Sequence, residues 1–572
     1  MTMRTFLLLV AIAAVGGCGG AALVRVPSPD PGSGAPAIQS AVDLGGLPIP
    51  GMGELSTGHS DGRFTPGEWV ALVGANLAAS PKVTVGSVEA PVVGYLKGGS
   101  ILIRVPRNLP PGSHTVTVET PAGKATAQLP VSIYAFGADT NGDSLRFRRI
   151  GPGSGEGFED AAPDIKFEKA RFFALSPDGA IMYAIQKPVD KTSGLVPSKI
   201  RTLLKIAKKV KGGPVTCQVL VVHVAGKDGP QTVRSFPLTL STKPSGMAMG
   251  PQGQLVILHK RNATLFDTSD PVQPREVTTL AFAAEHEKRT LVDAVFLDNG
   301  QWLAVLEAYE NRVHLVDMKN PAQPRLTPGV VLSDAVDQPF SIDLALGDDG
   351  RSLWVLQGPN LRLSGKRLLD GLKGLWKDVK KLQFRQAMGT AGGAIAGAGM
   401  ADTLSRLVQL ALQDGELRIV KSIMLPPEIY PFFIQPDRKG SVYVSGINRA
   451  APDFGHVEFS ISGLKSLLDQ FKNMVQVGRI LKVSAADGSN TTELKGFAIY
   501  YDIGLLPAGQ LLVSVVRLNA TYFPPKISLD WGFEISGKGF VKLREVANST
   551  FKLTEALKKL LPPYSYEQIG AQ

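Results

Sequence analysis

Seven histidines and two cysteines are the residues of this 572-residue chain best suited to acid–base, nucleophilic or metal chemistry. The histidines are dispersed over the chain: His59, His114, His223, His259, His286, His314 and His456. None stands beside a second histidine, cysteine or acid at the spacing of a strong zinc site. The sequence also lacks a GxSxG motif, a P-loop and a dinucleotide fingerprint. No catalytic residue is therefore assigned, and His223 and His314, which lie in strand patterns, are expected to be packed histidines.

One short segment has the oxygen-rich spacing of a calcium loop. Asp139, Asn141 and Asp143 alternate with Thr and Gly in the way an EF-hand loop begins. The sixth position is Ser144 where such a loop needs glycine, and the twelfth is Ile150 where it needs glutamate. These three residues are weak calcium candidates, and a plain inter-domain turn is the alternative.

The N-terminal residues predict export of the chain. Arg4 gives a short positive region, and the apolar run 6–15 follows it. Ten residues span about 15 Å as a helix, which is half of a bilayer core. The run is therefore a signal-peptide core and too short to be a stable membrane span. Cys18 comes directly after it, and a thiol is a good nucleophile for accepting a lipid group.

The segment Val15-Gly16-Gly17-Cys18 resembles the lipobox of bacterial lipoproteins. The resemblance implies a signal peptide over residues 1–17, cleavage between Gly17 and Cys18, and a covalent lipid on Cys18 (palmitate in its acyl part) with no other cofactor. Because Gly19 follows where an aspartate would mark inner-membrane retention, the resemblance also implies an outer-membrane lipoprotein of the cell envelope, with the periplasmic or outer side left open. An ordinary signal peptide with a chance cysteine is the alternative.

The composition favours several β-domains. The chain is too long for one core, and 62 Gly and 41 Pro indicate frequent turns and short strands. With Cys18 lipidated, Cys217 has no disulfide partner and is expected to pack as a small apolar residue in a buried strand. The net charge of +11 is local, because segments 199–211 and 362–385 together hold +12.

Residues 18–53 are rich in Pro, Gly, Ser and Ala and predict a flexible tether. Residues 54–134 predict a small β-sandwich, since short alternating runs are separated by turn residues. This segment resembles an IPT/TIG domain, an immunoglobulin-like module without catalytic function. The resemblance rests on these motifs: Phe64-Thr-Pro-Gly67, Val73-Gly-Ala-Asn-Leu77, Val85-Gly86, Val105-Pro106, Leu109-Pro-Pro-Gly112 and the Thr120–Gly123 turn.

A repeat occupies residues 137–550. Each unit is an apolar strand, a turn ending in glycine, and a second apolar strand, centred on Gly179, Gly253, Gly300, Gly350, Gly440 and Gly509. Gly253, Gly300 and Gly350 are 47 and 50 residues apart, and the other gaps are longer. A repeat of this length with insertions is typical of a β-propeller, in which the glycine belongs to the hairpin between the first two strands of a blade. Six blades are countable. Strands from 137–168 and from the C-terminus are candidates for a seventh.

The turns Asp270-Pro-Val-Gln-Pro274 and Asn320-Pro-Ala-Gln-Pro324 follow strands that end in Asp267 and Asp317. This pairing resembles the LVIVD-type propeller repeat. The fold prediction is therefore mainly β: a small Ig-like β-sandwich followed by a six- or seven-bladed propeller, with residues 551–572 as a C-terminal helix and tail.

Three insertions, near 186–213, 359–405 and 446–477, all interrupt the connection from the second strand of a unit to the third. Equivalent connections emerge on the same face of a propeller, so the insertions are expected to decorate one face. Each has an amphipathic helical pattern. The first two also carry the residues that are candidates for contact with a membrane or partner: Lys205, Lys208, Lys209, Lys373, Trp376, Lys377, Lys380 and Lys381.

These basic helices have two interpretations. They are solvated faces lying on the propeller, or they bind an anionic surface such as lipid headgroups, lipopolysaccharide or an acidic protein. Nucleic acid is a poor candidate partner for an exported protein.

The sequence therefore predicts a lipid-anchored envelope protein that binds or scaffolds a protein, glycan or anionic membrane partner. The alternative is a lactonase-like hydrolase with a metal in the propeller channel, for which the first strands offer mainly Asp293 and Asp343. Whether the protein is an enzyme stays open, with binding favoured.

Overall fold

The fold is described from a computed structural model of the chain. The structure describes residues 34–43, 64–138 (without 97–98 and 107–108), 144–150, 165–166, 170–176, 181–186, 213–282 (without 225–229), 291–332 (without 309), 340–358, 405–448 (without 438) and 478–550 (without 497, 507–508, 523–524 and 537–538). These residues are almost entirely β-strand, and the one helical element among them is a short 3-10 turn, Asp298–Gly300. In this part of the chain no helix is long and apolar enough to cross a membrane.

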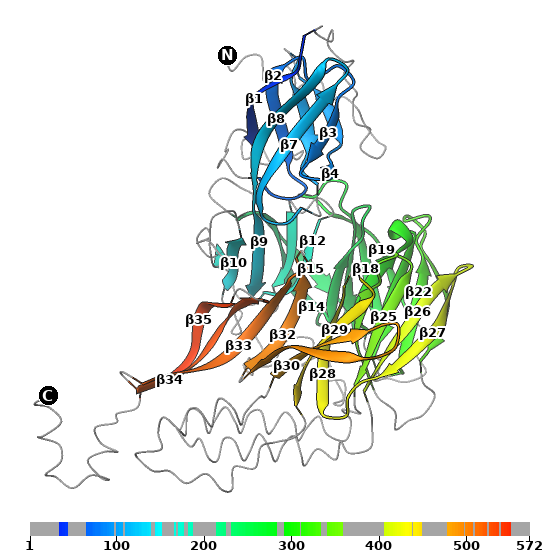
Figure 1. Cartoon of the computed structure of the whole chain (residues 1–572). Helices are drawn as coiled ribbons and strands as arrows, with labels where there is room; N and C mark the ends of the chain where they lie inside the picture. Colours follow the sequence, from blue (N-terminus) through cyan, green and yellow to red (C-terminus); the bar gives the residue numbers. More distant parts are fainter. Residues whose placement is uncertain are drawn as a thin grey trace, which may run out of the picture.

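The N-terminal region consists of two four-stranded antiparallel sheets. One has the order β1-β2-β6-β5 and the other β4-β3-β7-β8. The strands are β1 Ala37–Asp43, β2 Trp69–Ala75, β3 Lys82–Val85, β4 Val88–Glu89, β5 Val92–Tyr95, β6 Ile101–Arg104, β7 Gly112–Thr120 and β8 Gly123–Val131. Buried residues of both sheets, among them Leu72, Ile103, Val116 and Val131, form a single core. The pair of sheets is therefore a β-sandwich, which Figure 1 shows above the rest of the strands.

The predicted flexible tether over 18–53 is wrong for residues 37–43, which form strand β1. Residues 37–43 pair with β2, and Ile38 and Ala41 pack against the sandwich core. Gly74 of β2 makes this pairing possible, because a Cβ there would overlap the carbonyl oxygen of Ala37. The strand is short, begins after Pro and Gly, and contains small side chains, so its apolar pattern is too weak to predict from the sequence.

Six four-stranded antiparallel sheets follow, each with its strands in chain order. Sheet 1 has β12 Ala170–Leu175, β13 Ile181–Gln186, β14 Val215–His223 and β15 Gln231–Leu240. Sheet 2 has β16 Gly246–Met249, β17 Gln254–His259, β18 Asn262–Asp267 and β19 Arg275–Ala281. Sheet 3 has β20 Leu291–Leu297, β21 Trp302–Glu307, β22 Arg312–Asp317 and β23 Arg325–Val331.

The last three sheets follow the same plan. Sheet 4 has β24 Phe340–Leu346, β25 Ser352–Gly358, β26 Arg406–Gln413 and β27 Glu416–Met424. Sheet 5 has β28 Ile429–Pro436, β29 Ser441–Asn448, β30 Gly478–Ser484 and β31 Asn490–Gly496. Sheet 6 has β32 Ala498–Leu505, β33 Leu511–Tyr522, β34 Pro525–Ile535 and β35 Gly539–Thr550. Cys217 lies buried in β14, as expected for a packed thiol.

The six sheets form the blades of a β-propeller, which confirms that part of the fold prediction. The first strand of each sheet contacts the first strand of the next, from β12 through β16, β20, β24 and β28 to β32. Second strands are almost fully buried, as in β17, β21 and β25, because other sheets pack against both of their faces. Figure 1 shows the sheets succeeding one another in chain order.

Glycine fixes the turn between the first and second strands. Gly253, Gly300, Gly350, Gly440 and Gly509 all have positive φ, between 67° and 85°. Residues that carry a side chain rarely adopt this conformation, so the turn requires glycine at the same place in sheets 2 to 6. Gly179, the sixth predicted repeat glycine, lies outside the described residues.

A further three-stranded sheet, of order β11-β10-β9, precedes the six. Its strands are β9 Ile133–Ala138, β10 Ser144–Ile150 and β11 Ile165–Lys166, and β9 begins two residues after β8 ends. The C-terminal strand β35 pairs with β34 in sheet 6. It does not join the three-stranded sheet, in contrast to the suggested shared seventh blade. The predicted C-terminal helix over 551–572 lies outside the described residues.

Antiparallel strands in chain order give the propeller two distinct faces. Connections from strand 1 to 2 and from 3 to 4 emerge on one face, here called the turn face. Connections from strand 2 to 3 and from each sheet to the next emerge on the other face. The three longest second-to-third connections follow β13, β25 and β29, so this second face is called the insertion face. The segments of these three connections that were predicted to be helical lie outside the described residues.

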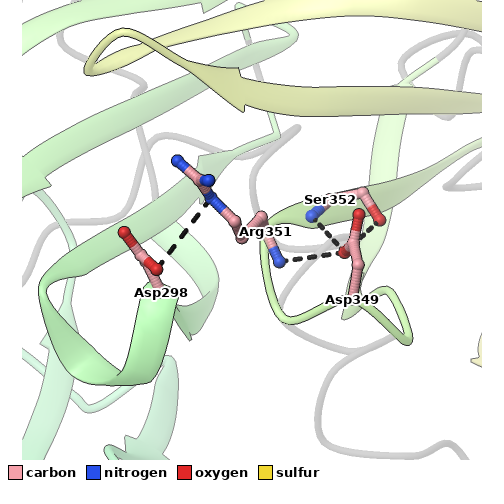
Figure 2. A network of polar contacts seen from close by, with 4 residues as sticks. All are labelled: Asp298, Asp349, Arg351 and Ser352. Carbon is pink, nitrogen blue, oxygen red and sulfur yellow. Dashed lines mark hydrogen bonds and ion pairs between the residues drawn. The ribbon is translucent and has the colours of Figure 1, made fainter.

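Cross-sheet hydrogen bonds join the turns on the turn face. Figure 2 shows Asp349 accepting from the backbone N–H groups of Arg351 and Ser352, at 2.9 and 2.7 Å, while the Arg351 Nε lies 3.9 Å from Asp298 of the preceding sheet. The Asp298 N–H also donates to the Gly350 carbonyl oxygen at 2.7 Å. Burial raises the pKa of Asp349, but the hydrogen bonds outweigh it and the net pKa is lowered. The ionised carboxylate thus stabilises the turn.

Replacing Gly446 of β29 by alanine tests the close packing of sheet 5. A Cβ at Gly446 would overlap the Tyr430 carbonyl oxygen and lie 3.0 Å from the Pro431 Cα. Since both contacts are backbone, G446A is expected to lower the free energy of unfolding by about 1–3 kcal/mol, measured by urea denaturation. The matched control is G504A in β32, where the nearest atom lies at 3.7 Å. It should be neutral or slightly stabilising, and equal losses in both variants would contradict the packing.

Candidate functional site on the insertion face

The predicted site residues all lie outside the described part of the chain. They are Gly17, Cys18, Asp139, Asn141, Asp143, Lys205, Lys208, Lys209, Lys373, Trp376, Lys377, Lys380 and Lys381. The structure describes the strands from which the three long connections depart and to which they return. The residues at these strand ends therefore form the rim of the insertion face within the described part of the chain.

Four consecutive sheets each carry an arginine at the rim of the insertion face. Arg312, Arg406 and Arg479 occupy the same register position, at the start of the third strand of sheets 3, 4 and 5. Each arginine pairs with a residue of the second strand. That second-strand residue also pairs with the first strand, at the position just before the bulge in the first strand. In order from the first strand to the third, the paired residues are Leu291–Glu307–Arg312, Ser341–Gln357–Arg406 and Pro431–Gly446–Arg479. Arg261 lies in the second-to-third turn of sheet 2. These four residues are called the arginine row.

Three guanidinium groups of the row have a buried donor that the described residues do not satisfy. The Nε atoms of Arg261, Arg312 and Arg479 are buried and have no hydrogen-bond partner in the part of the chain that the structure describes. A buried unpaired N–H is costly, and in native proteins such donors are usually satisfied. The row therefore has unused capacity for an acceptor, which for arginine is best an anion.

Arg479 and Arg406 also make contacts within the propeller: the Arg479 Nη1 lies 3.9 Å from the Glu428 Oε1, and Arg406 makes two hydrogen bonds. The Arg406 Nε donates to the Gln357 Oε1 at 2.6 Å and its Nη2 to the Leu332 carbonyl oxygen at 3.0 Å. Gln357 in turn donates to the Ser341 Oγ at 3.3 Å. Burial lowers the pKa of Arg406. Arg406 thus ties sheet 3 to sheet 4 while keeping a positive charge at the rim.

A buried acid lies beside the row in sheet 3. Glu307 is fully buried, and its Oε2 lies 3.2 Å from the His314 Nε2. The His314 ring packs edge-on against Phe282, with ring centroids 5.0 Å apart. His314 is therefore a packed histidine with a carboxylate partner, and His223 is likewise buried at the end of β14.

Asp293 and Asp343, the channel residues considered for a metal, hold neighbouring first strands together. Asp293 Oδ2 accepts the Leu344 N–H at 3.2 Å, and Asp343 Oδ2 accepts the Ile434 N–H at 2.7 Å. Asp502 occupies the equivalent position in sheet 6, after the same bulge, and is exposed. Among the described residues no group of three or more His, Cys, Asp or Glu is arranged to hold a metal ion. The carboxylates of Asp293 and Asp343 therefore act as links between blades.

The sequence alone did not reveal the arginine row. Its members are single residues that lie at least 50 positions apart in the chain, so they form no run of charge. The signal that identifies them is register: three follow a second-to-third connection at the same strand position.

No family model and no curated protein matches this chain. Among solved structures, a candidate 6-phosphogluconolactonase from Bacteroides uniformis is 12% identical and covers 73% of this chain and 98% of its own, with a TM-score of 0.43. The periplasmic gluconolactonase of Pseudomonas aeruginosa is 10% identical over 73% of this chain and 95% of its own, with a TM-score of 0.41. The Cps50 β-propeller domain of Myceliophthora thermophila is 10% identical over 68% and 96%, with a TM-score of 0.36.

These scores are low, so the class of the protein rests on its own strands. The sheet order and the contacts between successive first strands define a β-propeller protein with an N-terminal β-sandwich. Propellers host both binding and catalysis, and the fold by itself does not select between them.

Proposed function

We propose that this chain is a lipid-anchored binding or scaffold protein of the bacterial cell envelope, whose propeller engages an anionic partner through its insertion face. The observation that carries this proposal is the arginine row. Three of its members, Arg261, Arg312 and Arg479, each have a buried Nε donor without a partner among the described residues, although the Arg479 Nη1 lies 3.9 Å from the Glu428 Oε1. An anionic ligand would satisfy the donors and offset the charge.

The insertions are proposed to add positive charge to the same face. Segment 199–211 and segment 362–385 belong to second-to-third connections and hold +12 between them. Seven lysines there are proposed to contact the partner together with Trp376: Lys205, Lys208, Lys209, Lys373, Lys377, Lys380 and Lys381. A charged face of this kind also speeds the encounter with an anionic partner.

The N-terminal segments fit the roles of a membrane anchor and a spacer. The resemblance of residues 15–18 to a lipobox supports an anchor on Cys18 in the outer membrane. The resemblance of residues 64–123 to an IPT/TIG domain supports a non-catalytic spacer. A tethered propeller would keep its insertion face at high effective concentration near a partner on the same membrane. Lipid headgroups, lipopolysaccharide and an acidic envelope protein or glycan share the chemistry that the arginines recognise.

Flotation with lipid vesicles tests this proposal. The full chain with Cys18→Ala removes the anchor, so any binding belongs to the folded protein. It should float with vesicles containing anionic lipid, fail to float with zwitterionic vesicles, and lose binding as salt rises through the range where the Debye length falls below about 10 Å. Charge reversal of the seven lysines to Glu should abolish flotation. Equal binding by this variant would contradict the proposal.

The hydrolase alternative makes a different prediction. A lactonase-like site would need a metal held in the channel, whereas Asp293 and Asp343 already accept backbone N–H groups. Elemental analysis of the purified protein separates the two cases. One metal ion per chain, lost on replacement of these aspartates, would support the hydrolase.

A further inference from the structure

A chain of hydrogen bonds on the insertion face links an exposed serine to a buried histidine. Ser241 is the first residue after β15, in the connection from sheet 1 to sheet 2, and its Oγ lies 2.9 Å from the His259 Nδ1. His259 ends β17 and is buried. Its Nε2 lies 2.9 Å from the Thr264 Oγ1. Two different sheets therefore bring the pair together.

The far end of this series of hydrogen bonds determines which group donates at each step. Thr264 Oγ1 lies 2.9 Å from Thr279 Oγ1, which donates to the Glu276 Oε1 at 3.2 Å. An ionised carboxylate only accepts, so the Thr279 hydrogen points to Glu276, and the Thr279 oxygen accepts from Thr264. The Thr264 oxygen then accepts from His259 Nε2–H. The ring is left with a lone pair on Nδ1, which accepts the Ser241 hydroxyl.

A third side chain completes the group. The Asn262 Nδ2 donates to the Ser241 Oγ at 3.0 Å. An amide nitrogen carries two N–H donors, so the second is available beside the hydroxyl oxygen. Nucleophile, base and a donor for developing negative charge thus meet at one exposed point.

We propose that Ser241, His259 and Asn262 form an acyl-transfer site that cleaves activated esters or thioesters. The Ser241 Oγ adds to the acyl carbon while its proton passes to His259 Nδ1. The bond to the leaving oxygen or sulfur breaks, and that atom takes the proton from Nδ1. Water then adds to the acyl carbon by the same route, releasing the acid and restoring the serine. Thr264, Thr279 and Glu276 are positioning residues that select the histidine tautomer.

The burial of the histidine defines the kind of substrate. Burial lowers the pKa of His259 to about 4, so the ring is neutral at neutral pH and keeps its Nδ1 lone pair. A histidine with so low a pKa is a weak general base for the Ser241 hydroxyl. The site therefore favours acyl groups with good leaving groups, such as aryl esters and thioesters, over amides.

Labelling with a fluorophosphonate probe tests the site directly on the full chain. The Ser241 oxygen would attack phosphorus and expel fluoride, which adds the probe to one serine identifiable by peptide mass spectrometry. S241A should lose the label, and H259Q should slow labelling by about 10²-fold or more. The matched control is S269A, because Ser269 is also a polar turn serine, yet its Oγ donates to the Asp267 Oδ2 and has no histidine partner.

A second measurement separates catalysis from folding. T264V keeps the shape of the side chain and removes the acceptor for His259 Nε2–H, so it should slow both labelling and p-nitrophenyl acetate hydrolysis while the circular dichroism spectrum stays unchanged. The absence of label at Ser241 in folded parent protein, or equal labelling of Ser241 and Ser269, would overturn the proposal. Vesicle binding plays no part in this assay, so its outcome is independent of the proposed envelope function.

Discussion

Replacing Asp343 by alanine is expected to lower the free energy of unfolding of the propeller by about 2–3 kcal/mol. The side chain is 5% exposed, and its Oδ2 accepts the Ile434 N–H at 2.7 Å across the boundary between sheets 4 and 5. The alanine variant leaves that buried N–H without an acceptor, and this desolvation cost is larger than the net worth of the bond itself. Urea denaturation followed by tryptophan fluorescence measures the loss.

Two companion variants show whether the link between blades is the cause. D343N keeps one oxygen that accepts the Ile434 N–H and should lose less stability than D343A. D502A removes the carboxylate at the equivalent, exposed position of sheet 6 and should cost well under 1 kcal/mol. Similar losses in D343A and D502A would show that position in the repeat, and not the buried bond, determines the effect.

Acidification between pH 6.5 and 4 is expected to remove about 3 kcal/mol of stability through His259 alone. Burial lowers the pKa of His259 from 6.5 to about 4 in the folded protein. At pH values well above 6.5 the ring is neutral in both states and makes no difference. As the pH falls from 6.5, the unfolded chain takes up a proton that the folded chain refuses, so stability decreases until the folded histidine titrates near pH 4.

The measurement is the urea midpoint of the parent and of H259Q at pH 7, 6, 5 and 4. Without the titrating ring, H259Q should lose less stability over this range than the parent. H114Q is the control, because His114 is a partly exposed histidine of the sandwich whose Nε2 lies 2.7 Å from the Pro110 carbonyl oxygen. It should retain the acid sensitivity of the parent. Parallel pH profiles for the parent and H259Q would contradict this account.

The sequence predicts the propeller because its repeat is local. Alternating apolar runs recur in each sheet and a glycine with positive φ recurs in sheets 2 to 6, and both signals act within about fifteen residues of chain. Strand β22, Arg312–Asp317, ends at Asp317 as the sequence predicts. Strand β1 escapes prediction because its pairing with β2 depends on Gly74, some thirty residues away.

The candidate sites are harder to predict because they are assembled across sheets. Ser241 and His259 belong to different blades, and no linear motif joins them. The arginine row consists of isolated residues brought into line by strand register. The links made by Asp293 and Asp343 also depend on the next blade, so their carboxylates resemble metal ligands in the sequence and act as backbone acceptors in the structure.

Binding of an anionic partner to the insertion face is tested by comparing charge removal on the two faces of the propeller. The double variant Arg312→Gln with Arg479→Gln removes two charges from the insertion face. The control, Arg351→Gln with Lys439→Gln, removes two exposed charges from the first-hairpin turns of the turn face.

Both are made in the chain with Cys18→Ala and assayed by flotation with anionic vesicles at low salt. The insertion-face variant is expected to bind at least tenfold more weakly, about 1.4 kcal/mol, and the control is expected to keep near-parental affinity. Equal loss in both variants would show that only net charge matters. Loss confined to the control would place binding on the opposite face and contradict the account.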